Sequence, residues 1–190
     1  MTEPRIEFVF GEVNDQLRRE LRVFWSQYGN AYQEELRSFR VGSSHSHALQ
    51  PADPPKKPMS QEPAAISRDQ SGAINGIVFV VLRELEDSLG FGTHAYFQRI
   101  YITPEARYLT KNLSYQRLAN QLFRTFLQGF DREVEKRDHR AKVLLSENIN
   151  PGLQRASMRR YFARLGFQML GGNQLGGEVW CKKLETRFRF

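Results

Sequence analysis

Residues 100–115 read IYITPEARYLTKNLSY, and this stretch decides the fold. An apolar run ends just before Pro104, which stops a strand because proline has no N–H for the sheet ladder. A basic loop follows, and an amphipathic helix is predicted to begin at Ser114, a residue type that caps helices well. A strand, a basic loop and a helix in this order can form an anion-binding site.

The start of this helix is the first candidate binding site. The first turn of a helix carries amides without an intrahelical partner and the positive end of the helix dipole, which together bind anions such as diphosphate. We expect a diphosphate to lie on the amides of residues 112–115, with Arg107 and Lys111 adding positive charge. Most strand-to-helix loops bind nothing, so the surrounding sequence must make this pattern specific.

The rest of the chain alternates between strand and helix patterns. In the expected helices, apolar residues recur at spacings of three and four. Helices are expected from Asn14 to Leu36 with a break at Gly29-Asn30, from Ser114 to Phe130, and from Pro151 to Leu165. Strands are expected over residues 6–10, 64–69, 74–82, 95–102, 141–145, 167–170 and 178–184. This order predicts the α+β class, with a mixed, mostly antiparallel central sheet flanked by helices.

The length and composition suit one domain over residues 1–190. The chain has 190 residues, 40% of them hydrophobic, which is enough for one sizeable core. Residues 40–63 differ, because they hold five of the eight prolines and almost no large apolar side chains. Such a segment buries too little surface to offset its ordering entropy. We expect a flexible Pro-rich loop, with a lid over a ligand as the alternative.

The charge balance points to an anionic partner. The formal net charge of +7 favours a nucleotide cofactor, an acidic carrier protein or nucleic acid, and of these we expect nucleic acid least. No apolar run approaches the ~20 residues that span a bilayer. The first ten residues lack the apolar core of a secretory signal, so we expect a cytoplasmic protein.

The cysteine and histidine content excludes several chemistries. Cys181 is the only cysteine, which rules out an internal disulfide and a thiolate metal cluster within the chain. Its place beside Trp180 in an apolar strand indicates packing. The four histidines are scattered at positions 45, 47, 94 and 139, so we expect no metal site.

Two groups of residues resemble a known superfamily. Pro104-Glu105-Ala106-Arg107, between a strand and a helix, is similar to the opening of the cofactor motif of the GNAT acyltransferases. Asn150-Pro151 and Arg164-Leu165-Gly166-Phe167 resemble the Asn-Pro and Lys-Leu-Gly-Phe that bracket the family's later helix. With the final strand pair, the resemblance extends over residues 64–184. The chain therefore resembles a divergent GNAT member.

The resemblance implies a site for acetyl-CoA or another acyl-CoA. The family's diphosphate turn is rich in glycine, and the turn here has none. Matching from Arg107 directly puts residues 108–112 in the turn. We prefer to match from the helix start, which aligns residues 111–114 with Lys-Gly-x-Gly, because asparagine tolerates left-handed geometry and serine is small.

The implied cofactor contacts then follow along the chain. The backbone of Ile100, Tyr101 and Ile102 is expected to pair with the pantetheine arm, as an amide-bearing chain can extend a sheet edge. The expected cofactor-binding residues are Ile100, Tyr101, Ile102, Arg107, Lys111, Asn112, Leu113, Ser114, Tyr115 and Asn150.

Acyl transfer to an amine also needs a base and an acid. Glu147, expected between a strand and a helix, is the first candidate base, and His94 is the second. The family often has a tyrosine four residues before the helix-ending glycine, where it protonates the departing thiolate. That position is Phe162 here, and Tyr161 lies one residue earlier, about 100° around the helix. We name Tyr161 as the candidate acid, with core packing as the alternative.

These expectations combine into two hypotheses. The first is an N-acyltransferase that moves an acetyl or longer acyl group from acyl-CoA to an amine on a small molecule or a protein, by direct attack. An acidic acyl-carrier protein is an alternative donor. The second is a catalytically inactive GNAT-like module that binds a protein or nucleic-acid partner.

Overall fold

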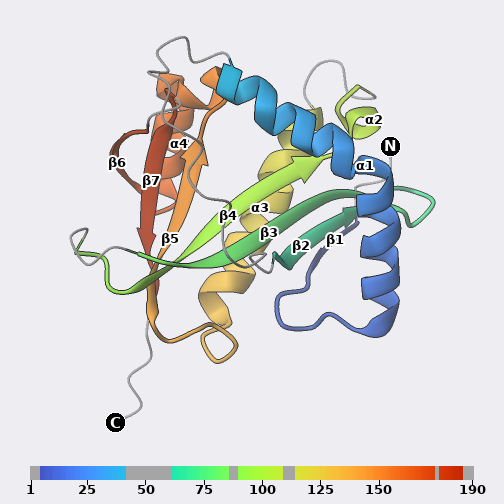
Figure 1. Ribbon diagram of the computed structural model, residues 1–190, viewed down its shortest axis with the longest axis horizontal. Helices are drawn as coiled ribbons and strands as arrows, with labels where there is room; N and C mark the ends of the chain where they lie inside the picture. The colour runs from blue at the N-terminus through green and yellow to red at the C-terminus, as the bar shows by residue number, and fades with distance from the viewer. Residues whose placement is uncertain (1–4, 42–60, 86–89, 109–113, 174–175, 186–190) are drawn as a thin grey trace.

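The computed structural model describes residues 5–41, 61–85, 90–108, 114–173 and 176–185. Its strands form one seven-stranded sheet within those residues, in the order β1-β2-β3-β4-β5-β7-β6 (Figure 1). Only β4 and β5 pair in parallel, and every other pair is antiparallel. The expected mixed, mostly antiparallel sheet is confirmed. The strands are β1 (Arg5–Phe8), β2 (Glu62–Arg68), β3 (Ile74–Glu84), β4 (His94–Ile102), β5 (Ala141–Asn148), β6 (Gln168–Gly172) and β7 (Glu178–Lys183).

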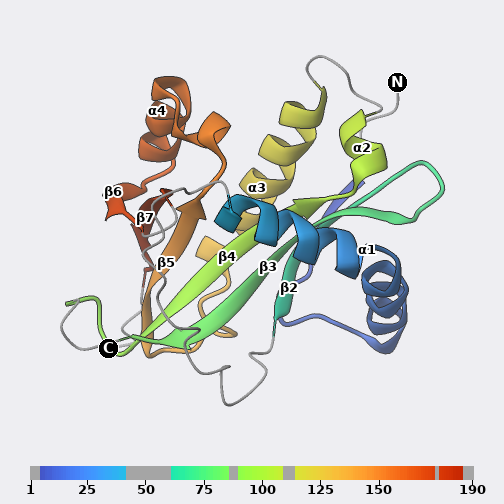
Figure 2. The ribbon, with the colours of Figure 1, turned by 45° about the horizontal axis from the view of Figure 1, so that its top comes forward.

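The helices cover both faces of the sheet (Figure 2). Alternation along β3 sends Val78 and Val80 into a core with α3 and α4, and Ile77 and Phe79 into a second core with α1. Residues 42–60, most of the expected Pro-rich loop, lie outside the described part of the chain. The helices are α1 (Asp15–Val41), α2 (Pro104–Tyr108), α3 (Ser114–Arg132), the 3₁₀ helix η2 (Pro151–Gln154) and α4 (Ala156–Arg164).

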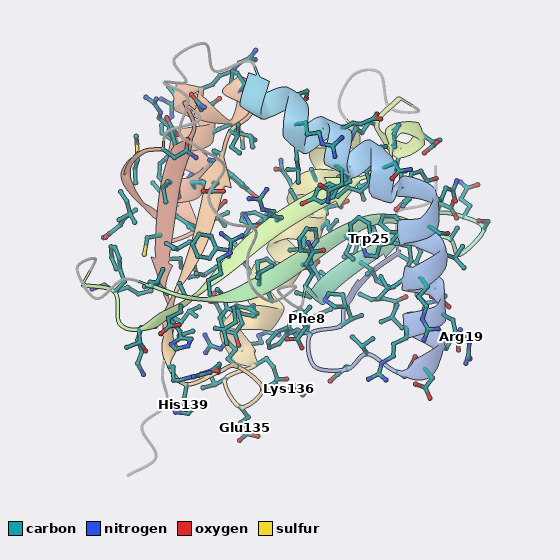
Figure 3. The ribbon with its side chains drawn as sticks, viewed as in Figure 1. Phe8, Arg19, Trp25, Glu135, Lys136 and His139 are labelled. Atoms are coloured by element: carbon teal, nitrogen blue, oxygen red, sulfur yellow. The ribbon has the colours of Figure 1, made fainter. Side chains whose placement is uncertain are left out.

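Helix α1 is continuous, so the expected break at Gly29-Asn30 was wrong. The helix runs for 27 residues, from Asp15 to Val41. Its apolar stripe continues past Gly29: Trp25 lies over the sheet with its ring centroid 5.9 Å from that of Phe79, and Tyr32 is 5.3 Å from Tyr101 (Figure 3). This packing on both sides of the glycine outweighs the ~1 kcal/mol that glycine costs in a helix.

Two more local expectations need correction. The expected basic loop after the strand begins as a short helix, α2, with Pro104 at its first position. The expected helix from Pro151 to Leu165 is two elements, because Arg155 is extended (φ −65°, ψ 149°) between η2 and α4. Gly166 ends α4 with a φ of 85°, as the sequence indicated.

The single cysteine packs in the core. Cys181 is 5% exposed, and burial raises the pKa of its thiol, which confirms the packing interpretation. None of the helices in the described part of the chain combines the length and apolar character needed to span a lipid bilayer.

Two glycines in helices provide a matched test of the packing. A Cβ on Gly129 of α3 would overlap the ring of Phe8, whereas a Cβ on Gly29 of α1 would meet nothing within 4 Å. We expect Gly129→Ala to lower the free energy of unfolding by about 1–3 kcal/mol, because overpacking exceeds the gain in helix propensity. Gly29→Ala should raise it by up to about 1 kcal/mol. Urea unfolding checks both, and a stabilised Gly129→Ala variant would contradict the packing of β1 on α3.

Candidate functional site

The site begins where two central strands separate. β4 and β5 pair from His94–Ala141 to Gln98–Ser146 and no further. Beyond that point β4 stays paired with β3 as far as Ile102, and β5 stays paired with β7 as far as Asn148. In an antiparallel ladder every second residue directs its N–H and C=O away from its partner. Every second residue among 99–102 therefore presents its backbone groups to an opening in the middle of the sheet.

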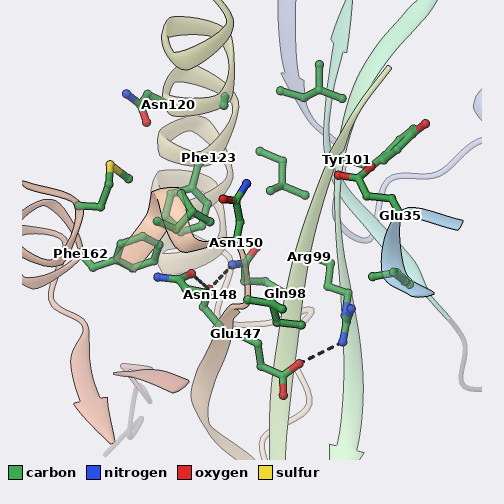
Figure 4. Close-up of a pocket in the computed structure, with 18 of the residues that line it drawn as sticks. Glu35, Gln98, Arg99, Tyr101, Asn120, Phe123, Glu147, Asn148, Asn150 and Phe162 are labelled. Atoms are coloured by element: carbon green, nitrogen blue, oxygen red, sulfur yellow. Dashed lines mark hydrogen bonds and ion pairs between the residues drawn. The ribbon is translucent and has the colours of Figure 1, made fainter. Parts of the chain in front are cut away.

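A cavity of about 200 Å³ lies at this opening (Figure 4). Its lining comes from both faces of the sheet, so the cavity passes between β4 and β5. The α3 and α4 side contributes Gln98, Ile100, Ile102, Ala119, Asn120, Phe123, Ser146, Asn148, Leu153, Met158, Tyr161 and Phe162. The α1 side contributes Tyr32, Glu35, Leu36, Arg99, Tyr101 and Glu147, and the lining is completed by Arg107, Ile149 and Asn150.

A chain of buried polar side chains links the two strands at the end of their ladder. Gln98 Nε2 donates to Ser146 Oγ over 2.6 Å, and Ser146 Oγ donates to Asn148 Oδ1 over 3.5 Å. Gln98 is 8% exposed, Ser146 1% and Asn148 2%. Gln98 Oε1 and Asn148 Nδ2 have no partner within the described structure. Exchanging oxygen and nitrogen in both amides would again leave one donor and one acceptor unpaired.

Two tyrosines of the lining also carry unpaired hydroxyls. Tyr161 on α4 and Tyr101 on β4 have buried oxygens without a partner among the described residues. Burial raises the pKa of Tyr161, an effect that the nearby charge of Arg124 opposes. Burial likewise raises the pKa of Tyr101, opposed by Arg107. Both phenols therefore keep their protons at neutral pH and above, and Tyr161 can donate one.

The α1 side of the cavity is lined by ion pairs. Arg99 Nη2 lies 3.1 Å from Glu147 Oε2, and the two side chains are 29% and 26% exposed. Glu147 belongs to β5 itself, so the expectation that it lies between a strand and a helix was wrong. Arg107 makes a two-pronged pair with Glu35 of α1, at 3.0 and 2.7 Å. These contacts tie α1 and α2 to the edges of the opening.

Arg107 has a further contact that bears on its predicted role. Its Nε donates to the carbonyl of Ile102 over 2.7 Å, at the end of the strand segment expected to pair with pantetheine. The guanidinium thus joins α2, the end of β4 and, through Glu35, the C-terminal half of α1. In this structure Arg107 shapes the cavity, and its expected contact with a diphosphate stays a prediction.

The structure gathers most of the sequence-predicted residues that it describes. His94 lies at the first residue of β4, the end of the strand opposite the opening, and its ring is 2.9 Å from the Thr93 hydroxyl. Ser114 and Tyr115 form the start of α3. Lys111, Asn112 and Leu113 lie outside the described residues, so the expected diphosphate seat stays a prediction. The predicted residues that line the cavity are Ile100, Tyr101, Ile102, Arg107, Glu147, Asn150 and Tyr161.

Sequence reasoning missed Glu35, Arg99, Ser146 and Asn148. A weak signal existed for two of them, because Ser146 and Asn148 are small polar residues that follow the apolar run Val143-Leu144-Leu145. No group of three or more His, Cys, Asp or Glu side chains able to hold a metal ion occurs in the described part of the chain.

Comparison with known proteins shows the fold. The chain is similar to the crystal structure of a GNAT superfamily phosphinothricin acetyltransferase from Sinorhizobium meliloti in complex with AcCoA, with a TM-score of 0.51 and 13% identity over 96% of this chain and 89% of that chain. A putative acetyltransferase from Acinetobacter baylyi ADP1 matches with a TM-score of 0.43 and 14% identity, over 98% of this chain and 96% of that one. The sequence matches no protein-family model and no curated protein.

The Arg107–Glu35 pair should contribute measurably to stability. A two-pronged, part-buried pair is worth about 1 kcal/mol, so Arg107→Gln and Glu35→Gln should each lower the free energy of unfolding by about that amount. The double variant should lose less than the sum of the two. The exposed Arg18–Asp15 pair, at 3.6 Å, is the control and should show coupling near zero. Equal coupling in both double-mutant cycles would contradict this structural role.

Proposed function

We propose that this chain, which has the fold of the GNAT acetyltransferases, transfers an acetyl or longer acyl group from an acyl-CoA to an amine. The observation that carries the proposal is the cavity that passes between β4 and β5. A cavity open to both faces of a sheet lets a thioester and an amine approach the same point from opposite sides. Direct attack by the amine then needs no covalent intermediate on the enzyme.

The residues at the opening suit the arm of an acyl-CoA. The backbone of residues 99–102 offers hydrogen-bonding groups in the direction that an additional strand would occupy. The arm contains amides, which have both the donors and the acceptors that such an edge requires. Phe123, Met158 and Phe162 give the α3 and α4 side of the cavity an apolar surface for the arm or the acyl group.

The charge on the α3 and α4 side suits the phosphates of the same ligand. The sequence has no acidic residue between Glu105 and Asp131, or between Glu147 and Glu178. These two acid-free segments contain most of α3 and all of η2 and α4. They favour a polyanionic donor, either a CoA thioester or an acidic acyl-carrier protein. Arg107 pairs with Glu35 and Arg159 with Glu178, and the other basic residues of the two segments are Lys111, Arg117, Arg124, Arg155, Arg160 and Arg164.

Two side chains of the lining supply the acid and the base. When it is bound, the CoA thioester provides the acyl carbon that the amine attacks. Glu147 accepts the proton that the amine must lose, directly or through a water molecule. Tyr161, whose protonated hydroxyl has no partner among the described residues, donates a proton to the departing sulfur. The acceptor is a small-molecule or protein amine.

Ligand binding tests the proposal directly. Acetyl-CoA at a hundred times its Kd should stabilise the chain by about 2.7 kcal/mol and raise Tm by on the order of 5–10 °C, with saturation. Differential scanning fluorimetry and titration calorimetry measure this effect across an acyl-CoA series. No melting shift and no heat with any acyl-CoA would contradict the proposal and favour the inactive binding module. Binding of nucleic acid by such a module would weaken steeply with salt.

Glu147→Gln should slow turnover with little effect on acetyl-CoA binding. Loss of a general base typically costs about 100-fold or more in kcat. Release of the CoA thiol measures turnover, and Glu12→Gln is the control, because Glu12 pairs with Lys136 away from the cavity. Unchanged kcat in Glu147→Gln would remove Glu147 from the mechanism.

Tyr161→Phe and Tyr96→Phe should give opposite results. The Tyr161 hydroxyl has no partner in the part of the chain that the structure describes, so its removal should leave stability equal or up to about 1 kcal/mol higher, while kcat falls about 100-fold. The Tyr96 hydroxyl accepts a 2.7 Å hydrogen bond from the Asp138 amide, outside the cavity, so its removal should cost about 1 kcal/mol and leave kcat unchanged. A Tyr161→Phe variant with unchanged kcat would exclude Tyr161 as the acid.

A further inference from the structure

The α1 side of the cavity contains charges that transfer to a simple amine does not need. Arg99 and Glu147 lie across the opening from each other, on β4 and β5, and form a pair at 3.1 Å (Figure 4). Arg99 also lies close enough to Tyr32 on α1 for its charge to lower the pKa of that phenol, against the larger, opposite effect of burial. Glu147 is the proposed base, so an acceptor amine must come close to this pair.

A second arginine makes the surroundings of Glu147 positive. Arg83 of β3 lies close enough for its charge to interact with both Arg99 and Glu147, and its Nε is buried without a partner in the described structure. Burial and the like charge of Arg99 lower the pKa of Arg83. Its guanidinium lies 4.7 Å from the centre of the Phe97 ring, which helps to hold it there. Two arginines thus lie within electrostatic reach of the Glu147 carboxylate, and Arg99 is the one in direct contact with it.

The charge balance discriminates between classes of amine. An ammonium group without its own anion would take Glu147 from Arg99 and leave two arginines unpaired beside a third positive charge. Part-buried charges without partners are costly. An amine with its own anionic group can bind Glu147 with its ammonium group and Arg99 with its anion, so that both members of the Arg99–Glu147 pair keep a partner.

We infer that the acceptor is a short zwitterion of the α-amino acid type, whose ammonium group binds Glu147 and whose carboxylate binds Arg99. The inference rests on the proposed function and adds the class of acceptor. Because Arg99 and Glu147 are in direct contact, the two charged groups of the ligand must be separated by only a few bonds. Arg99 is then a specificity residue, and Glu147 binds the amine before it accepts the proton.

The experiment compares matched acceptors with acetyl-CoA as donor. The panel contains the common L-amino acids, their carboxamides, which keep the amine but lose the anion, and the corresponding amines without the carboxyl group. For the preferred side chain, we expect the free acid to exceed its carboxamide in kcat/KM by on the order of tenfold to a hundredfold. Release of the CoA thiol gives the rates, and mass spectrometry identifies the N-acetyl product.

Variants at Arg99 separate recognition from a structural role. Arg99→Gln should raise KM for the acid and leave KM for the carboxamide nearly unchanged, so the preference disappears. Arg99→Lys should keep part of the preference for the free acid, because lysine retains the positive charge but lacks the planar guanidinium that binds a carboxylate through two hydrogen bonds. Arg19→Gln, on the exposed outer side of α1, is the matched control and should keep the full preference.

A binding measurement without acetyl-CoA distinguishes this inference from the proposed function. The same acids and carboxamides are compared for the rise in Tm that they produce. Stabilisation by the acids alone, with no transfer, would support the zwitterion site and overturn the proposed activity. Transfer to carboxamides or simple amines at least as fast as to acids would overturn the zwitterion site and support the activity. Neither stabilisation nor transfer would overturn both.

Discussion

The site depends on one constraint, the end of the β4–β5 ladder at Gln98 and Ser146. Strands in the middle of a sheet normally satisfy their backbone groups on both sides, and an unpaired buried group costs about as much as a lost hydrogen bond. Each strand here continues on its outer partner, β4 on β3 and β5 on β7. The opening is therefore built into the register of the sheet. An extended ligand with its own amides can supply the missing partners.

The sheet also separates two electrostatic environments. The acid-free segments that contain most of α3 and all of α4 lie on one face, where Arg159 pairs with Glu178 of β7. The Arg99–Glu147 and Arg107–Glu35 pairs lie toward α1. The basic residues on the α3 and α4 face stabilise a bound polyanion. The paired charges on the α1 face suit a ligand that carries both a positive and a negative group. If the proposed function holds, the acyl donor and the amine acceptor bind on different faces of the sheet and do not compete for the same site. The two meet only at the opening, where Glu147 and Tyr161 line the same cavity.

The order of the elements was predictable because apolar residues recur at every second position in strands and at every third or fourth position in helices. It failed at Gly29, where rings of α1 packed on the sheet keep a helix intact through a residue that disfavours helices. In the site, the residues at the end of β4 were predictable because they directly precede the Pro-Glu-Ala-Arg motif. The Arg99–Glu147 and Arg107–Glu35 pairs join residues 48 and 72 positions apart, and no local pattern encodes such contacts.

Phe162 and Tyr161 of α4 show how the structure accommodates a tyrosine that lies one position earlier than in the family's pattern. The Phe162 ring packs against those of Phe123, Phe167 and Trp180, so this position belongs to the core although it reaches the cavity. Tyr161 also lines the cavity, and its hydroxyl is buried without a partner among the described residues, which costs up to about 1 kcal/mol. A phenylalanine at this position would avoid that cost. Natural chains accept such local costs mainly at functional sites, so the unpaired hydroxyl itself favours Tyr161 as the proton donor.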